Sequence, residues 1–157
     1  MHIFKIKENG KPDNGEQLIL SHQRSCDPVI AKNGYAYVTL RSSAVGCFIG
    51  SNELQIIDIS QIKLPQYVGS IQMDGPKGLS FSNDGSAILI CDRDSLKIFS
   101  ISDPVYPIEM NEYETVKCND IVELDHHYII TGDELLSIYS YNPQDFSLTF
   151  ETDLLAL

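Results

Sequence analysis

The chain has 157 residues, of which 43% are apolar, and it carries 11 basic against 22 acidic side chains for a net charge of −11. This length suits one ordinary domain with its own core, while the negative charge disfavours nucleic acid and anionic membrane surfaces as partners. No apolar run reaches the roughly 18 residues of a membrane-spanning helix.

The N-terminal segment alternates in polarity. Residues 1–7, MHIFKIK, predict a strand rather than a signal peptide, and residues 16–22 predict a second strand beside it. The rest of the chain contains short runs rich in Val, Ile, Tyr and Phe, separated by Asn-Gly, Asp-Gly, Pro and Ser. No stretch has the apolar stripe of a helix, so the pattern predicts an all-β fold.

One strand motif occurs four times, at residues 1–7, 54–60, 96–102 and 135–142. When these copies are aligned, four isoleucines coincide: Ile3, Ile56, Ile98 and Ile138. The last three copies begin about 40 residues apart, a spacing typical of four-stranded propeller blades. The first interval is longer because a Gly/Ser-rich insertion occupies residues 41–52.

The strands around this motif complete a repeating unit. They are expected at 27–31, 35–40 and 66–73, at 77–82, 87–92 and 107–114, and at 120–124, 128–132 and 147–154. The sequence therefore predicts a partial β-propeller of about three and a half four-stranded antiparallel blades. Its single domain, 1–157, divides into an outer half-blade (1–22) and blades at 23–73, 74–114 and 115–157.

Closure of a propeller ring takes about four to eight blades. We therefore expect this chain to be a fragment or an open arc of a longer propeller. Self-association of the incomplete propeller is the alternative, although two copies would still lack the inner strands of each half-blade.

Two segments resemble a known repeat. LQIIDISQIKLPQYVGS (54–70) resembles the LVIVD repeat closely, and LKIFSISDPVYPIEM (96–110) resembles it more loosely. SHQRSCDPVIAKNGYAYVTLRS (21–42) is similar to the C-terminal half of LVIVD-repeat lipoproteins of Bacteroidetes. The resemblance implies an exported propeller that is lipid-anchored in the cell envelope as a full-length protein, through an anchor absent from this chain. It implies no particular catalytic residues.

Four cysteines map to one end of the predicted blades: Cys26, Cys47, Cys91 and Cys118. A disulfide between Cys26 and Cys47 is the favoured pairing, because it would hold the insertion to its own blade. Cys91–Cys118 is the second candidate, and a role for Cys91 as an apolar core residue is its alternative. Either bridge requires an oxidising compartment.

A metal site is not predicted. The cysteine spacings are irregular, and the chain has neither a Cys-x-x-Cys pair nor a His-x-x-x-His pair. His126 and His127 fall in a predicted turn at the opposite end of the blade, where solvated histidines are the ordinary interpretation.

A polar surface is predicted at the end that carries the cysteines. Its members are His22, Arg24, Asp27, Arg41, Asp92, Arg93, Asp94, Asn119, Asp120 and Asp133. Four of these are expected nearest the central channel, as a mixed-charge pocket for a polar ligand: Arg24, Asp27, Arg41 and Asp120. The structural alternative, which we favour, is that the two aspartates begin strands and accept backbone N–H bonds.

No motif in the chain indicates a reaction. There is no Gly-x-Ser-x-Gly nucleophile turn and no phosphate-binding loop, so no catalytic residue and no cofactor is predicted. The leading hypothesis is a non-enzymatic scaffold that binds a protein or a polar ligand. The alternative is part of a propeller hydrolase, lyase or quinoprotein-like dehydrogenase with its site at the central channel, an analogy that rests on fold alone.

Overall fold

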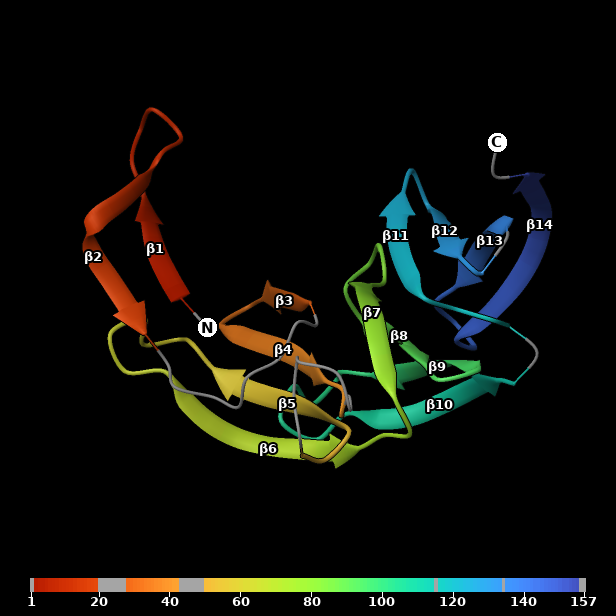
Figure 1. Ribbon diagram of the computed structural model, residues 1–157, viewed down its shortest axis with the longest axis horizontal. Coiled ribbons are helices and arrows are strands. Elements are labelled where there is room, and N and C mark those ends of the chain that lie inside the picture. The colour runs from red at the N-terminus through yellow and green to blue at the C-terminus, as the bar shows by residue number, and fades with distance from the viewer. Residues whose placement is uncertain (1, 20–27, 43–49, 115, 134, 156–157) are drawn as a thin grey trace.

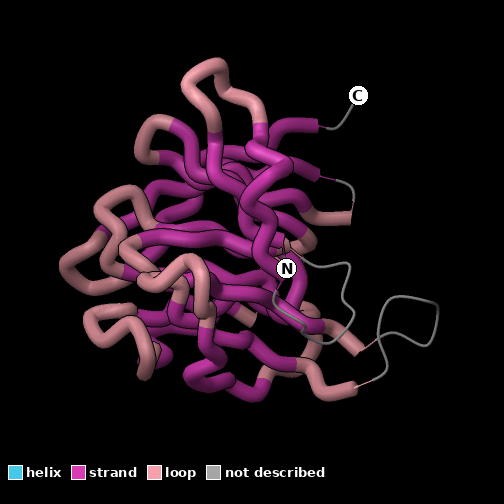
Figure 2. The backbone as a smooth tube through the Cα atoms, turned by 90° about the vertical axis from the view of Figure 1, so that its left-hand side faces the viewer, coloured by secondary structure: helices cyan, strands magenta, loops and turns pink. Residues whose placement is uncertain are grey.

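A computed structural model describes residues 2–19, 28–42, 50–114, 116–133 and 135–155. These residues form strands, turns and loops (Figure 2), so the predicted all-β class is confirmed. In this part of the chain no helix is long and apolar enough to cross a membrane.

The strands form one hairpin and three four-stranded antiparallel sheets. The hairpin pairs β1 (His2–Ile6) with β2 (Pro12–Ile19). Sheet I contains β3 (Val29–Lys32), β4 (Tyr35–Leu40), β5 (Glu53–Asp58) and β6 (Gln66–Gln72). Sheet II contains β7 (Pro76–Phe81), β8 (Ala87–Asp92), β9 (Ser95–Ser100) and β10 (Ile108–Tyr113). Sheet III contains β11 (Asp120–Leu124), β12 (His127–Thr131), β13 (Leu135–Asn142) and β14 (Ser147–Leu155).

In each four-stranded sheet the strands pair in chain order, which is the arrangement predicted for three and a half repeats. Figure 1 shows the hairpin and the three sheets following one another along an open arc. The first strands, β3, β7 and β11, lie on its inner side, and the fourth strands, β6, β10 and β14, lie on its outer side. Because successive strands are antiparallel, the connections between them lie alternately at the two ends of each sheet.

The predicted hairpin turns adopt the backbone that their residues favour. Asn33 and Gly34, between β3 and β4, have φ values of 51° and 83°. Gly85, between β7 and β8, has φ 75°. Positive φ suits Asn and Gly, and turns of this hand match the twist of the strands that they join.

Aliphatic side chains fill the spaces between the sheets. Leu54 and Ile56 of sheet I pack with Ile88 and Ile90 of sheet II. On the other face of sheet II, a second cluster joins its strands β8 and β9 to strands β11 and β12 of sheet III. All six residues of β8 are buried, because sheet II is covered on both faces. Burial of this kind, at about 25 cal/mol per Å² of apolar surface, is the main stabilising term.

Buried tyrosines add hydrogen bonds between neighbouring sheets. The Tyr37 hydroxyl donates to the carbonyl of Pro104 at 3.1 Å. The Tyr128 hydroxyl accepts the N–H of Asn83 at 2.8 Å. Burial raises the pKa of both Tyr37 and Tyr128 to about 12, so both hydroxyls keep their protons at neutral pH. Tyr37 thus anchors a connection of sheet II to sheet I, and Tyr128 anchors another to sheet III.

A disulfide joins Cys91 of β8 to Cys118 in the connection that precedes β11. Both residues are buried, and their Cα atoms lie 5.1 Å apart. The bond links sheets II and III covalently at one end. The favoured partners, Cys26 and Cys47, lie outside the described residues.

We expect proteolysis of the non-reduced protein to release a linked peptide that contains both Cys91 and Cys118. The double variant Cys91→Ala/Cys118→Ala should lose about 3–4 kcal/mol of unfolding free energy, because the closed loop of 27 residues restricts the unfolded chain. Mass measurement and urea unfolding check these outcomes. Alkylation of both thiols in the folded, non-reduced protein would contradict them.

Candidate functional site

The two ends of the sheets differ in their polar chemistry. We call the end with the β6–β7, β8–β9, β10–β11 and β12–β13 connections the β8–β9 end, and the other the β7–β8 end. Two of the four predicted site residues, Arg41 and Asp120, lie at the β8–β9 end. Arg41 directly follows β4 and is half-buried, and Asp120 is the exposed first residue of β11. Arg24 and Asp27 lie outside the described residues.

A chain of hydrogen bonds crosses from sheet II to sheet III at this end. The Lys77 ammonium donates to Asn119 Oδ1 at 2.7 Å. Asn119 Nδ2 in turn donates to Asp133 Oδ1 at 3.0 Å. Asn119 is also fixed through its backbone, because its N–H donates to the carbonyl of Thr131 at 2.7 Å. We call Lys77, Asn119 and Asp133 the Lys77 cluster.

A glycine allows the two sheets to come this close. The Gly78 N–H donates to the Asn119 carbonyl at 3.1 Å. A Cβ placed on Gly78 would lie 2.5 Å from the Cα of Asp120, which is backbone and cannot move aside freely. Only glycine fits between β7 and β11 without a backbone shift. The same contact holds Asp120 beside the Lys77 cluster.

Asp120 has a local structural role. Its Oδ1 accepts the N–H of Ile121 at 2.9 Å, and its carbonyl accepts the hydroxyl of Thr131 at 3.4 Å. These bonds are those of a residue that starts a strand and caps the preceding turn. The side chain is nevertheless exposed, so Oδ2 remains open to a bound group.

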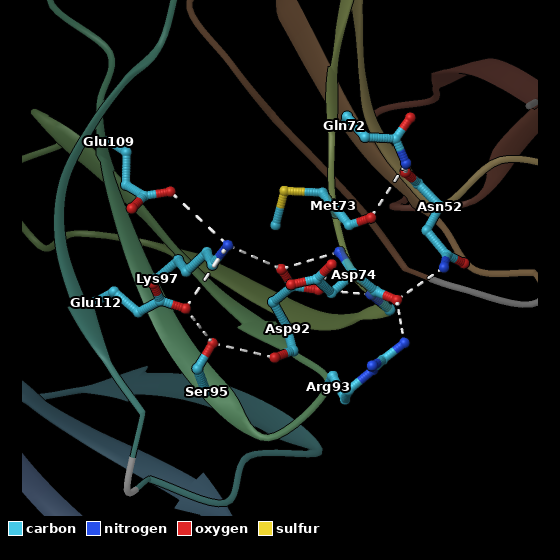
Figure 3. Close-up of polar contacts among 11 residues, drawn as sticks. Asn52, Gln72, Met73, Asp74, Asp92, Arg93, Ser95, Lys97, Glu109 and Glu112 are labelled. Carbon is cyan, nitrogen blue, oxygen red and sulfur yellow. Dashed lines mark hydrogen bonds and ion pairs between the residues drawn. The ribbon is translucent and has the colours of Figure 1, made fainter.

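Among the described residues, the most deeply buried carboxylate at this end belongs to Asp92, which is 1% exposed. Asp92 ends β8, and its Oδ1 accepts the N–H groups of Gly75 and Asp74 at 2.7 and 3.0 Å. Lys97 places its ammonium 3.3 Å from Oδ2. Figure 3 shows these groups converging on one carboxylate. Asp92 therefore holds the β6–β7 connection against the turn between β8 and β9.

Lys97 completes this network from β9. Its ammonium lies 3.6 Å from Glu112 and 3.8 Å from Glu109, both on β10. Burial by itself lowers the pKa of Lys97, but the hydrogen bond and charge of Asp92, followed by the charges of Glu112 and Glu109, raise it above its ordinary value. Lys97 is therefore a fixed cation inside the network, and its bonds are structural.

The base of the 41–52 insertion is tied to the same connection. Asn52 Nδ2 donates to the carbonyl of Asp74 at 2.7 Å, and Arg93 donates to the same carbonyl at 3.3 Å (Figure 3). The N–H of Ser42 donates to Asn52 Oδ1 at 2.7 Å. A hydrogen-bonded asparagine thus joins both ends of the insertion within the described residues.

The described histidine side chains lie at the other end. His126 lies in the β11–β12 turn, as predicted, whereas His127 is the first residue of β12; both are exposed. His126 contacts the side-chain amide of Asn83, and the ring of His127 lies 3.0 Å from the carbonyl of Asp125. In the part of the chain that the structure describes, no group of three or more His, Cys, Asp or Glu side chains is placed to hold a metal ion.

Sequence reasoning did not single out Lys77 or Lys97. Lys97 lies between Leu96 and Ile98, and Lys77 lies between Pro76 and Gly78, so the sequence indicates only that both are in strands. Their partners lie on other strands or in another sheet, and this distance in sequence hides the pairing. The one local signal is that Lys77 directly precedes Gly78 at the start of a first strand.

Sequence comparison identifies the repeat. The LVIVD repeat model matches residues 47–72 and 88–115. These segments contain strands β5 and β6 and strands β8 to β10, so LVIVD repeats build parts of sheets I and II. This agrees with the resemblance at residues 54–70 and 96–110. Among curated proteins no sequence match is found.

Solved structures show the same fold at low identity. A Lactobacillus plantarum protein has a TM-score of 0.74 at 10% identity, with 99% of this chain and 49% of that chain covered. A putative 6-phosphogluconolactonase from Bacteroides uniformis scores 0.71 at 12% identity, with 94% and 46% covered. The periplasmic gluconolactonase of Pseudomonas aeruginosa scores 0.67 at 13% identity, with 98% and 50% covered. The chain spans about half the length of these propeller-like neighbours.

We expect Asp92→Ala to lower the unfolding free energy by about 3 kcal/mol, because it leaves two buried N–H groups and the Lys97 ammonium without their main acceptor. Asp94→Ala is the matched control, since Asp94 is exposed in the same turn, and it should change the free energy by less than about 0.5 kcal/mol. Urea unfolding measures both. Equal stability of the two variants would show that the network contributes nothing.

Proposed function

We propose that the chain is an arc of a β-propeller that acts as a binding scaffold, with a polar ligand held at the β8–β9 end. The LVIVD repeats and the propeller-like structural neighbours support the architecture. A propeller places its first strands around a central channel. In this chain β7 and β11 are first strands. Lys77 lies on β7, Asp120 begins β11, and Asn119 directly precedes β11.

The Lys77 cluster is the observation that carries the proposal. Its side chains come from two sheets and already hold one another in fixed positions, so a ligand would meet a preorganised surface. The cluster offers ammonium and amide donors beside the carboxylates of Asp120 and Asp133, both exposed. Alternating donors and acceptors suit hydroxyl groups, which donate and accept, and we therefore propose a polyhydroxylated ligand.

The second candidate is a lactone hydrolase. Two of the structural neighbours described above are named as a putative 6-phosphogluconolactonase and a gluconolactonase. At 12–13% identity the likeness supports the shared fold alone. The described residues place no histidine against a serine or cysteine side chain, and a lactonase site would have to use the carboxylates and Lys77.

The proposal includes a location in the cell envelope, with the full-length protein lipid-anchored there. The resemblance of residues 21–42 to lipoproteins of Bacteroidetes supports this location. The disulfide between Cys91 and Cys118 adds support, because such bonds persist in oxidising compartments.

δ-Gluconolactone tests both candidates, because it is polyhydroxylated and also hydrolysable. We expect it to shift the amide resonances of Gly78, Asn119 and Asp120 without being hydrolysed faster than in buffer. Asp120→Asn should weaken binding several-fold, whereas Asp94→Asn, in an exposed turn at the same end, should leave it unchanged. NMR titration and a pH-stat follow binding and hydrolysis.

Two outcomes would contradict the scaffold proposal. Hydrolysis above the spontaneous rate that is lost in Asp120→Asn would make the chain part of a lactonase. Resonance shifts confined to residues away from β7 and β11 would show that the Lys77 cluster is a structural link between sheets and not a binding surface.

A further inference from the structure

A second concave site lies at the β7–β8 end, at the opposite ends of the same first strands. A cavity of about 370 Å³ opens between β3, β7 and β11. Its walls include Ile30, Lys32, Phe81, Ile121, Val122 and Glu123. This volume falls within the range of small-molecule sites. Ser80, Ser82 and Asn83 also line the cavity, so its walls combine apolar side chains with polar and charged ones.

Lys32 supplies a cation at one wall. Its ammonium lies 5.5 Å from the centre of the Phe81 ring, a distance at which the ring face attracts a positive charge. The end of the side chain passes over Gly85, where a Cβ would come within 2.8 Å of Lys32 Cε. Gly85 therefore leaves the space that Lys32 uses, and Phe81 and Gly85 together hold the ammonium at the cavity.

Glu123 supplies an anion at another wall. It is half-buried on β11, and its Oε1 accepts the N–H of His126 at 3.1 Å. In the described part of the chain, Lys32 and Glu123 form no ion pair with each other or with any other residue. Opposite charges therefore face one cavity and are not joined across it.

The polar groups next to them are already engaged. The Ser82 hydroxyl donates to Asp84 Oδ1 at 2.6 Å. Asn83 contacts His126 through its side-chain amide, and its Oδ1 accepts the N–H of Asp84 at 2.8 Å. A ligand in the cavity would consequently find two charged groups without an ion-pair partner, one of each sign, beside the apolar side chains of Phe81 and Val122.

We propose that this cavity binds a small zwitterion, an α-amino acid with an apolar side chain. The ligand carboxylate pairs with Lys32, its ammonium pairs with the open oxygen of Glu123, and its side chain packs on Phe81 and Val122. A dianion such as a phosphate monoester is disfavoured because Glu123 repels the second negative charge. The site is separate from the Lys77 cluster, and the inference stands whether or not that cluster binds a ligand.

L-Leucine and two analogues that each lack one charge test the proposal. 4-Methylpentanoate keeps the carboxylate and loses the ammonium, and isoamylamine keeps the ammonium and loses the carboxylate. We expect leucine to shift the amide resonances of Phe81, Ile121 and Val122, and to bind at least tenfold more tightly than either analogue. Calorimetric or NMR titration of the full 157-residue chain gives the affinities.

Two substitutions remove the charges singly. Lys32→Met keeps the aliphatic stem on Phe81, and Glu123→Gln keeps an acceptor for the N–H of His126. Each should weaken leucine binding at least tenfold, and only Lys32→Met should leave the affinity for isoamylamine unchanged. Lys63→Met and Glu114→Gln, at exposed positions away from the cavity, are the matched controls and should bind leucine as the unmodified chain does.

The outcomes separate the proposal from its alternatives. Equal affinity for 4-methylpentanoate and leucine would overturn it, because a carboxylate would then suffice. Absence of leucine binding at millimolar concentration, or binding unchanged in both variants, would also overturn it. If a variant melts earlier than its control, the resonances shifted by leucine in the unmodified chain decide the question: shifts outside the cavity walls contradict the proposal.

Discussion

The close approach of β7 to β11 at Gly78 is the constraint on which both candidate sites depend. Where β7 begins, the absence of a side chain lets the N–H of Gly78 reach the carbonyl of Asn119. That bond fixes the relative position of sheets II and III at their inner strands. Lys77 then bonds to Asn119 at one end, and Phe81 of β7 and Ile121 of β11 line the same cavity at the other. A wider spacing between β7 and β11 would break the hydrogen bond between Lys77 and Asn119 and would widen the cavity.

The two ends use this shared frame differently. At the β8–β9 end, Asp92 accepts backbone N–H groups and forms an ion pair with Lys97, and the Lys77 ammonium donates to the amide oxygen of Asn119. Buried charges are stable only when they are paired and hydrogen-bonded in this way. At the β7–β8 end, Lys32 and Glu123 are only half-buried, so water can solvate them until a ligand replaces it. The two ends of the same first strands therefore differ in how their charged side chains are bonded within the protein.

The repeat made much of the fold predictable. Leu54, Ile56, Leu96 and Ile98 occupy equivalent positions, and the structure buries all four between sheets. Ile138 aligns with Ile56 and Ile98 but is only partly buried, because no described sheet covers that face of β13. The periodicity of a strand predicts which face is apolar, but it does not tell what lies against that face.

The sites were less predictable because they depend on contacts between sheets. Asp92, Asn119, Asp120 and Asp133 were assigned to the correct end from strand order alone. The partners Lys77 and Lys97, and the charges Lys32 and Glu123, lie far apart in sequence from the groups they face. Gly78 does not lie in a turn motif. It is needed because a side chain there would collide with the backbone of Asp120 in the neighbouring sheet. The spacing of residues in the sequence therefore says little about which side chains of different sheets come into contact.

The unfolding free energy of Gly78→Ala, compared with that of Gly69→Ala, tests this account most directly. Gly69 lies in β6, where an added Cβ would meet nothing within 4 Å, so its replacement should leave the free energy within about 0.5 kcal/mol of the unmodified chain. Gly78→Ala should cost about 2 kcal/mol or more in urea unfolding, because the backbone of Asp120 must move. A Gly78→Ala variant as stable as Gly69→Ala would contradict the view that this contact fixes the arrangement of the sheets.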